Sequence, residues 1–480
     1  MEGHKMIPLI NQLPPEVLSR IFVIGNALSG GYRNARQDDA FRGRILRVCR
    51  YWKNVALDTA GLWSYITVSG RPPYRQAMCK AERAKYYSSL HMSFNFSTLP
   101  YHMGWQGLGR RAERIGQLVP EIARRGAAFD RWKSLRIITQ SLLEANTILN
   151  SLDKDGMSLE ALRIRITRLS LDGRDRKELD KNFVETLLSL FYSSPQLREF
   201  SMVGIEATVP IETYSPLKNL TRLELVRCKM HGMNHFHQLL SDNPRLEVLI
   251  LKGLYTSDGT SIPSMPVISF NDLQTLQLAD SISSWLSPTL LRAIDAPNLT
   301  SLGINIGGWP DKLESTLLME FLCSEECTFT TAALRRLSIG LFRCDSRLFL
   351  KLFTKCSGLT RLDWVVEQNK THSLILSHPP WLLTKLSHMR IASATMEVPL
   401  DYILEQTVFG RRDAGLPLRF LEVDGRTWSA VSAHTQTLLR NSLPDVGPAK
   451  STLKIDEETS SIDEQLSDVN SEGSSSSDEE

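Results

Sequence analysis

The chain has 480 residues, of which 42% are apolar and 23% charged, a composition typical of globular proteins. No stretch approaches the ~18 consecutive apolar residues of a membrane span, and the first residues, MEGHKMIPLI, lack the apolar core of a secretory signal. The seven cysteines are scattered, which favours reduced thiols and a cytoplasmic or nuclear location over a disulfide framework.

Charge is distributed unevenly along the chain. Lys454 is the last basic residue and ten of the 53 acidic residues follow it, so residues 1–454 carry 56 basic against 43 acidic side chains. The segment 448–480 is dense in Ser, Asp and Glu and has no aromatic residue, which predicts a disordered acidic tail. Acidic residues follow Ser476 and Ser477 at the third position, which leaves phosphorylation open beside a purely solubilising role.

The stretch NQLPPEVLSRIF at 11–22 predicts the start of a short helix. Proline is tolerated in the first helical turn because its missing N–H would have no intrahelical partner there. One apolar stripe follows, formed by Val17, Leu18, Ile21 and Phe22. We expect this helix to end near Ile24, before Gly25 and Asn26. A helix of about ten residues needs a partner surface for its stripe.

A second helical stripe runs through RILRVCRYWKNVA at 44–56, and an apolar pair, Leu62-Trp63, comes shortly after it. The polar segment 25–43 between the two helices is expected to be an inserted loop. Fewer than 60 residues bury only a modest core, so such a module leans on another surface. Strand-like alternation follows at 63–68 and 90–96, and then a loop with an Arg-rich helix at 104–132.

From about residue 130 one pattern recurs ten times: Leu, two variable residues, an apolar residue, a variable residue and another apolar residue. The copies lie at 159–164, 197–202, 220–225, 246–251, 273–278, 299–304, 334–339, 359–364, 386–391 and 418–423. Helical stripes separate many of the copies, and several stripes end at a Pro-containing turn such as DNPRL at 242–246. A period of this size predicts a solenoid with parallel strands on its concave side and helices outside.

The N-terminal motifs LPPEVLSRIF, VCRYW and LW together resemble the F-box over residues 10–66, and the repeats resemble leucine-rich repeats. The resemblance implies a non-catalytic subunit of an SCF-type cullin–RING E3 ubiquitin ligase. It would dock on a Skp-type adaptor through the F-box and hold a protein substrate on the repeats. The adaptor-contacting residues that the resemblance implies are Leu13, Pro14, Leu18, Ile21, Phe22, Val48, Cys49, Trp52, Leu62 and Trp63.

We therefore predict an α/β chain with four parts. They are an F-box-like module at 8–66 with an inserted loop at 25–43, a linking region at 67–129 that includes possible irregular first repeats, a leucine-rich-repeat-like solenoid at 130–447 and the tail at 448–480. In a strand the variable positions face away from the helices. This nominates as substrate-contacting residues Arg222, Glu224, Lys252, Gln277, Asn305, Arg336, Arg361 and Asp363.

Other functions are weighed against this interpretation. Residues 31–86 carry twelve Lys/Arg against four acids with interleaved aromatics, a pattern also found in nucleic-acid-binding proteins, although no nucleic-acid motif accompanies it. A repeat scaffold without a ligase role is a further alternative. The histidines of HGMNHFH do not converge as ligands, and Cys323 and Cys327 lack a partner pair for zinc. We expect no catalytic site, metal or cofactor, and no membrane partner.

Overall fold

The computed structural model describes residues 13–28, 35–70, 74–84, 87, 89–97, 105–167, 175–205, 216–230, 233–256, 266–279, 290–305, 312–329, 333–340, 344–366, 381–393, 400–443 and 445–448. The chain divides into two compact units. Unit 1 comprises residues 1–223 and 228–231, and unit 2 comprises 224–227 and 232–480. The predicted acidic tail after Pro448 lies outside the described residues.

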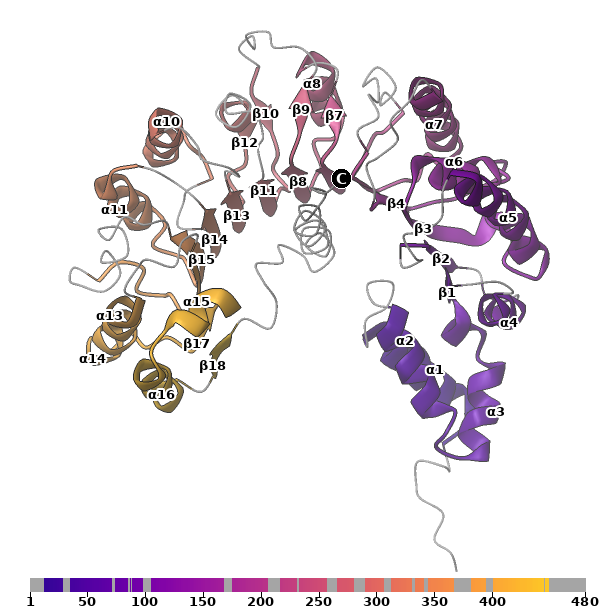
Figure 1. The fold of residues 1–480 in the computed structure, drawn as a ribbon, viewed down its shortest axis with the longest axis horizontal. Helices are drawn as coiled ribbons and strands as arrows, with labels where there is room; N and C mark the ends of the chain where they lie inside the picture. Colours follow the sequence, from indigo (N-terminus) through magenta and orange to yellow (C-terminus); the bar gives the residue numbers. More distant parts are fainter. Residues whose placement is uncertain are drawn as a thin grey trace, which may run out of the picture. The chain divides into compact units, whose positions relative to one another are not determined.

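Unit 1 begins with helices and continues as alternating strands and helices (Figure 1). Its helices are α1 (Pro15–Leu28), α2 (Ala35–Ile45), α3 (Arg50–Asp58), the 3-10 turn η3 (Ala60–Trp63), α4 (Arg75–Ala84), α5 (Trp105–Arg124), the 3-10 turn η4 (Phe129–Arg131), α6 (Leu142–Asn150) and α7 (Asp175–Ser193). Its strands are β1 (Tyr65–Ser69), β2 (Leu90–Asn95), β3 (Trp132–Thr139), β4 (Ala161–Ile166), β5 (Glu199–Val203) and β7 (Lys229–Met230). The division between the units passes through β6 (Arg222–Val226).

Unit 2 repeats the alternation of strands and helices. Its helices are α8 (Met233–Ser241), α10 (Lys312–Cys323), α11 (Ser346–Lys355), α13 (Leu400–Glu405), the π-helical turn η7 (Gln406–Gly410), α14 (Arg411–Asp413), α15 (Gly425–Ala430) and α16 (Ala433–Ser442). Its strands are β8 (Val248–Lys252), β9 (Tyr255–Thr256), β10 (Ile268–Ser269), β11 (Thr275–Ala279), β12 (Ile294–Asp295), β13 (Ser301–Asn305), β14 (Arg336–Gly340), β15 (Arg361–Val366), β16 (His388–Ser393), β17 (Phe420–Val423) and β18 (Asp445–Pro448).

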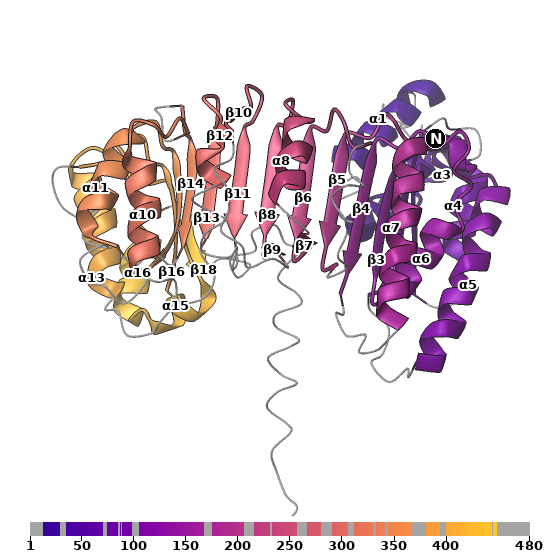
Figure 2. The same cartoon turned by 90° about the horizontal axis from the view of Figure 1, so that it is seen from above.

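The strands pair in parallel within each unit, as Figure 2 shows. In unit 1, β1 to β5 are neighbours in chain order. In unit 2 the order is β8, β11 and then β13 to β18. Each of the ten predicted motifs begins two residues before a strand, from β4 to β17, so the predicted strand–helix array is confirmed. Parallel neighbours need a crossover, which a helix supplies between most of the described strands, whereas the short strands β9 and β10 lie between β8 and β11.

The core of each unit lies between its strands and helices. The second apolar position of the motifs is fully buried, as for Leu223, Leu249, Leu276, Leu302, Leu337 and Leu362. On α11, Phe349 and Phe353 pack against Trp364 of β15 with ring centroids 5.8 and 5.9 Å apart, the first ring tilted and the second edge-on. The alternate positions of each strand point away from the helices. We call the surface that they form the strand face of a unit.

The expected end of the first helix and the expected loop 25–43 are wrong in the described part of that segment. Helix α1 continues through Gly25 and Asn26 to Leu28, and residues 35–45 form α2. Gly25 lies inside the helix and makes room for a neighbouring side chain. A Cβ at this position would lie 2.5 Å from Cζ of Phe41 in α2. The absent side chain lets the two helices approach closely, and Asn26 is itself buried.

Candidate functional site

Helix α1 has two apolar faces with different surroundings. The Pro14 carbonyl starts the helix by accepting from the backbone N–H of Val17 and of Leu18, both at 3.1 Å. Leu18 and Phe22 are buried in the module. Val17, Ile21 and Ile24 lie on another side, at i, i+4 and i+7, and are 45%, 46% and 51% exposed. We call these three residues the outward stripe of α1.

The inward face of α1 is held by aromatic and polar contacts. The ring of Phe22 packs on Trp52 of α3 with centroids 5.2 Å apart. Tyr51 donates from its hydroxyl to the Leu13 carbonyl at 2.6 Å, and Thr59 donates from its hydroxyl to Ser19 at 2.8 Å. These contacts tie α1 and the residues just before it to both ends of α3, through Tyr51 at its start and Thr59 just after its end.

Cys49 and Trp63 hold the second half of the module. The sulfur of Cys49 caps α3 by accepting from the backbone N–H of Trp52 at 3.4 Å. Trp63 is buried beside Leu62 and donates from its indole N–H to the Ala56 carbonyl at 3.0 Å. These side chains fix the relative positions of α3 and η3, which sets the surface that the module presents.

The ten residues expected to contact an adaptor thus fall into three groups. Leu18, Phe22, Leu62 and Trp63 are buried, Leu13, Cys49 and Trp52 are partly exposed, and Pro14, Ile21 and Val48 are exposed. Val17 and Ile24 were not among the ten, although both lie on the outward stripe. Their helical spacing with Ile21 was the available signal, but the resemblance to the F-box, which supplied the ten residues, does not include these two positions.

Some of the cationic side chains in the basic segment 31–86 are engaged in contacts within the protein. Arg42 is buried and donates to the Leu62 carbonyl at 3.1 Å. Arg83 lies over the Trp63 ring, 4.5 Å from its centroid, and Lys80 is buried. These three cations take part in internal packing, so the number of Lys and Arg residues in this segment overstates the positive charge on its surface.

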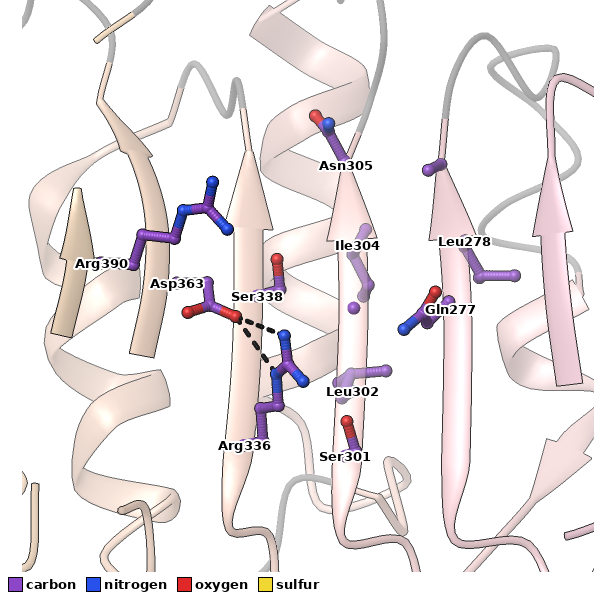
Figure 3. A pocket seen from close by; sticks show the side chains of 12 residues that line it. Gln277, Leu278, Ser301, Leu302, Ile304, Asn305, Arg336, Ser338, Asp363 and Arg390 are labelled. Atoms are coloured by element: carbon purple, nitrogen blue, oxygen red, sulfur yellow. Dashed lines mark hydrogen bonds and ion pairs between the residues drawn. The ribbon is translucent and has the colours of Figure 1, made fainter. Parts of the chain in front are cut away.

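A second candidate region is the strand face of unit 2. Four of the expected substrate-contacting residues, Gln277, Asn305, Arg336 and Asp363, line one cavity of about 30 Å³ there, together with Arg390 of β16 (Figure 3). The hollow exists because Ser301, Gly303 and Ser338 carry small or no side chains. The remaining expected residues lie elsewhere: Arg222 and Glu224 on β6, Lys252 buried on β8 and Arg361 beside Asp363.

Asp363 holds two arginines together on this face. Arg336 and Arg361 are register partners on β14 and β15. The Asp363 carboxylate accepts from Nη2 of Arg336 at 2.8 Å and from Nε of Arg361 at 3.0 Å, and its side chain is only 3% exposed. Burial lowers the pKa of Arg390 from its ordinary value, and Nε of Arg390 lies 4.0 Å from the Glu422 carboxylate. The cluster carries its own counter-ions.

The described residues contain no group of three or more His, Cys, Asp or Glu side chains that could hold a metal ion. A ring nitrogen of His237 lies 2.9 Å from the Pro266 carbonyl oxygen. Burial raises the pKa of the Cys323 thiol. No helix in the described part of the chain is long and apolar enough to cross a membrane.

Comparison with known families agrees with the geometry of the first module. Residues 10–69 match the family model described as F-box-like, so this part of the chain is an F-box-like domain. F-box domains generally bind Skp-type adaptors, and F-box proteins are generally non-catalytic adaptors in ubiquitin ligase complexes. No curated protein matches the chain. The parallel strand–helix array that follows is compatible with leucine-rich repeats.

Proposed function

We propose that this protein is the substrate-recognition subunit of an SCF-type cullin–RING E3 ubiquitin ligase. The observation that carries the proposal is the outward stripe of α1 within the F-box-like domain. The F-box-like domain would dock on a Skp-type adaptor. The strand–helix array, a leucine-rich-repeat-like solenoid, would hold a protein substrate.

The outward stripe has the properties of a docking surface. Burying one aliphatic side chain on binding contributes about 1.5–3 kcal/mol, so three side chains can supply much of a specific affinity. All three residues are β-branched, and their stiff χ1 angles lose little freedom when a partner covers them. The inward contacts of Phe22 and Tyr51 make the backbone of this helix a rigid support.

The proposed division of labour needs no chemistry from this chain. Ubiquitin transfer would be carried out by other subunits, and this protein would raise the effective concentration of the substrate near them. The strand faces support the substrate-binding part, because they gather charged and hydroxyl groups that a protein segment can meet. On unit 2 these groups include the exposed Arg336 and the half-buried hydroxyl groups of Ser301 and Ser338.

Adaptor binding is tested by calorimetry with a purified Skp-type adaptor and the full chain. Ile21→Glu removes one apolar contact and places a carboxylate in the interface, so we expect at least ~10-fold weaker binding. The matched control is Leu317→Glu on α10 in unit 2. Leu317 is 47% exposed against 46% for Ile21, and both substitutions replace an aliphatic side chain on a helix with a carboxylate. The control is expected to bind like the wild type.

Two outcomes would contradict the proposal. One is a wild-type chain that does not bind the adaptor. The other is an Ile21→Glu chain that binds as tightly as the Leu317→Glu control. Where adaptor binding holds, affinity capture with the proteasome inhibited, comparing wild type with Ile21→Glu, separates substrates, which both chains retain, from ligase subunits, which only the wild type retains.

A further inference from the structure

The strand face of unit 1 contains a cavity that no sequence pattern indicates. Its volume is about 180 Å³, larger than the hollow on unit 2, and it lies on β2 to β5. The side chains that set its chemistry are His91, Lys133, Arg136, Arg163, Arg198 and Glu199. None of them is among the residues expected to contact a substrate.

The register of the strands explains why a cavity forms at this place. Tyr65, His91, Ser134, Ala161 and Glu199 are successive partners across β1 to β5. The two central side chains are small, whereas Tyr65 and His91 stack at 4.5 Å on one side and Glu199 lies on the other. The row therefore dips in its middle, and the dip is the floor of the cavity.

The next row places positive charge directly beside the dip. Arg136 and Arg163 are register partners on β3 and β4, and like charges in that position repel each other. The Glu199 carboxylate lies 2.8 Å from Nη2 of Arg163, and the Glu160 carboxylate lies 3.1 Å from Nζ of Lys133. The cavity lining as a whole has four cationic side chains against two carboxylates, an excess of two positive charges.

Unit 1 as a whole also carries a net positive charge. Its residues 1–223 and 228–231 carry 34 basic and 21 acidic side chains, whereas residues 232–448 carry 19 and 21. A uniform excess of this kind attracts anionic partners from a distance. His91 adds nothing to it at neutral pH, because burial lowers its pKa to about 4.

We infer that this cavity receives an acidic side chain, Asp or Glu, from an extended segment of a bound protein. Arg136, Arg163, Lys133 and Arg198 line the cavity that the carboxylate would enter, and the Ser134 hydroxyl in it lies 2.8 Å from Nδ1 of His91. The inference rests on the proposed function only in identifying the bound protein as the ligase substrate. Glu160 and Glu199 line the same cavity, and the backbone phosphates of a nucleic acid could not turn away from them. In an extended peptide only alternate side chains face the cavity, which is why a peptide carboxylate is favoured over nucleic acid.

Fluorescence anisotropy of the full chain with labelled hexaglutamate tests the site, with labelled hexaglutamine as the uncharged probe. We expect the wild type to bind hexaglutamate and not hexaglutamine. Arg136→Gln combined with Arg163→Gln removes two charge-assisted contacts and is expected to weaken binding by ~10-fold or more. The matched control is Arg412→Gln combined with Arg419→Gln, two exposed arginines of unit 2, which is expected to change binding less than ~2-fold.

Glu199→Gln gives a readout that misfolding cannot imitate. It removes the carboxylate that competes for Arg163, so hexaglutamate is expected to bind ~2–5-fold tighter. Equal affinity for the two probes, or an equal loss in the site and control variants, would overturn the inference. So would weaker binding by Glu199→Gln, or an oligonucleotide that binds through Arg136 and Arg163 while hexaglutamate does not.

Failure here and failure of the proposed function are separable. Adaptor binding depends on the outward stripe of α1 and is measured with a different ligand. A chain that binds the adaptor but shows no Arg136-dependent hexaglutamate binding disproves only the cavity assignment. A chain that binds hexaglutamate through Arg136 but ignores the adaptor disproves only the ligase assignment.

Discussion

Two pairs of neighbouring arginines occupy the strand faces of this protein, and they differ in what accompanies them. Arg336 and Arg361 in unit 2 are bridged by Asp363, which lies two positions after Arg361 on β15. Arg136 and Arg163 in unit 1 are partners in the same way, but the residue two positions after Arg163 is Arg165. In unit 2 one buried carboxylate contacts both arginines of the pair, whereas in unit 1 the Glu199 carboxylate contacts Arg163 and a further cation follows on β4.

The comparison shows that an arginine pair is not by itself a binding site. Where a buried carboxylate lies between the guanidinium groups, the pair is part of the scaffold and leaves a cavity of only about 30 Å³ nearby. On unit 1 the Glu199 carboxylate pairs with Arg163, and Ser134 and Ala161 beside the arginines leave a cavity of about 180 Å³ with an excess of positive charge. Strand register and side-chain size decide between the two roles.

The largest expected effect on stability comes from the bridging carboxylate. Asp363→Asn leaves two neighbouring arginines without the anion between them. Because the Asp363 side chain is almost fully buried while the arginines are partly exposed, we expect a loss of about 2–3 kcal/mol in the free energy of unfolding. Urea denaturation followed by tryptophan fluorescence measures it. A loss below ~1 kcal/mol would mean that the two pairs do not differ as described.

A second prediction concerns the histidines stacked beside each arginine pair. His91 stacks on Tyr65, and its pKa in the folded chain is about 4, well below the ordinary value of 6.5. The unfolded chain therefore binds the proton first as the pH falls. Stability is fully present above about pH 6.5 and is lost towards pH 4, by roughly 1–2 kcal/mol at pH 5 after allowing for partial exposure.

His91→Gln is expected to remove most of this loss when urea midpoints at pH 7.5 and pH 5 are compared. His388, which stacks on Phe420 at 4.3 Å, is the matched position in unit 2. Its pKa is also lowered by burial, but less strongly than that of His91, so His388→Gln is expected to leave most of the acid sensitivity in place. Equal effects of the two substitutions would contradict the assignment of acid sensitivity to unit 1.

The smallest expected effect is that of Glu199→Gln on stability. Glu199 pairs with Arg163 at 2.8 Å, but both side chains retain contact with water, and such pairs contribute about 1 kcal/mol or less. We expect a change below ~1 kcal/mol in the same urea experiment as for Asp363→Asn. A loss as large as that of Asp363→Asn would show that Glu199 is a structural counter-ion and would remove the contrast between the two faces.

Much of the strand–helix array could be predicted because each repeat satisfies a local rule. The alternation of LQTLQL and the proline of DNPRL need only short-range geometry, and the strands begin where the motifs indicate. Strand β3 and helix α6 were missed, because LRIITQ lacks the complete pattern and LLEANTILN has no purely apolar face, since the polar Glu144 and Asn146 are buried with its apolar residues. Helix α6 is instead marked by Ser141 and Glu144, a capping pair that sequence analysis did not use.

The sequence by itself determined the alternating apolar positions, the helix start at Pro14-Pro15 and the motifs of an F-box-like domain. These depend on periodicity and backbone restriction, which act over a few residues. Only the tertiary structure decided that α1 passes Gly25 beneath Phe41 and turns Ile21 outward, and that Ser134 and Ala161 open a cavity beside Arg136 and Arg163. These features depend on which distant side chains meet, and register and packing set that.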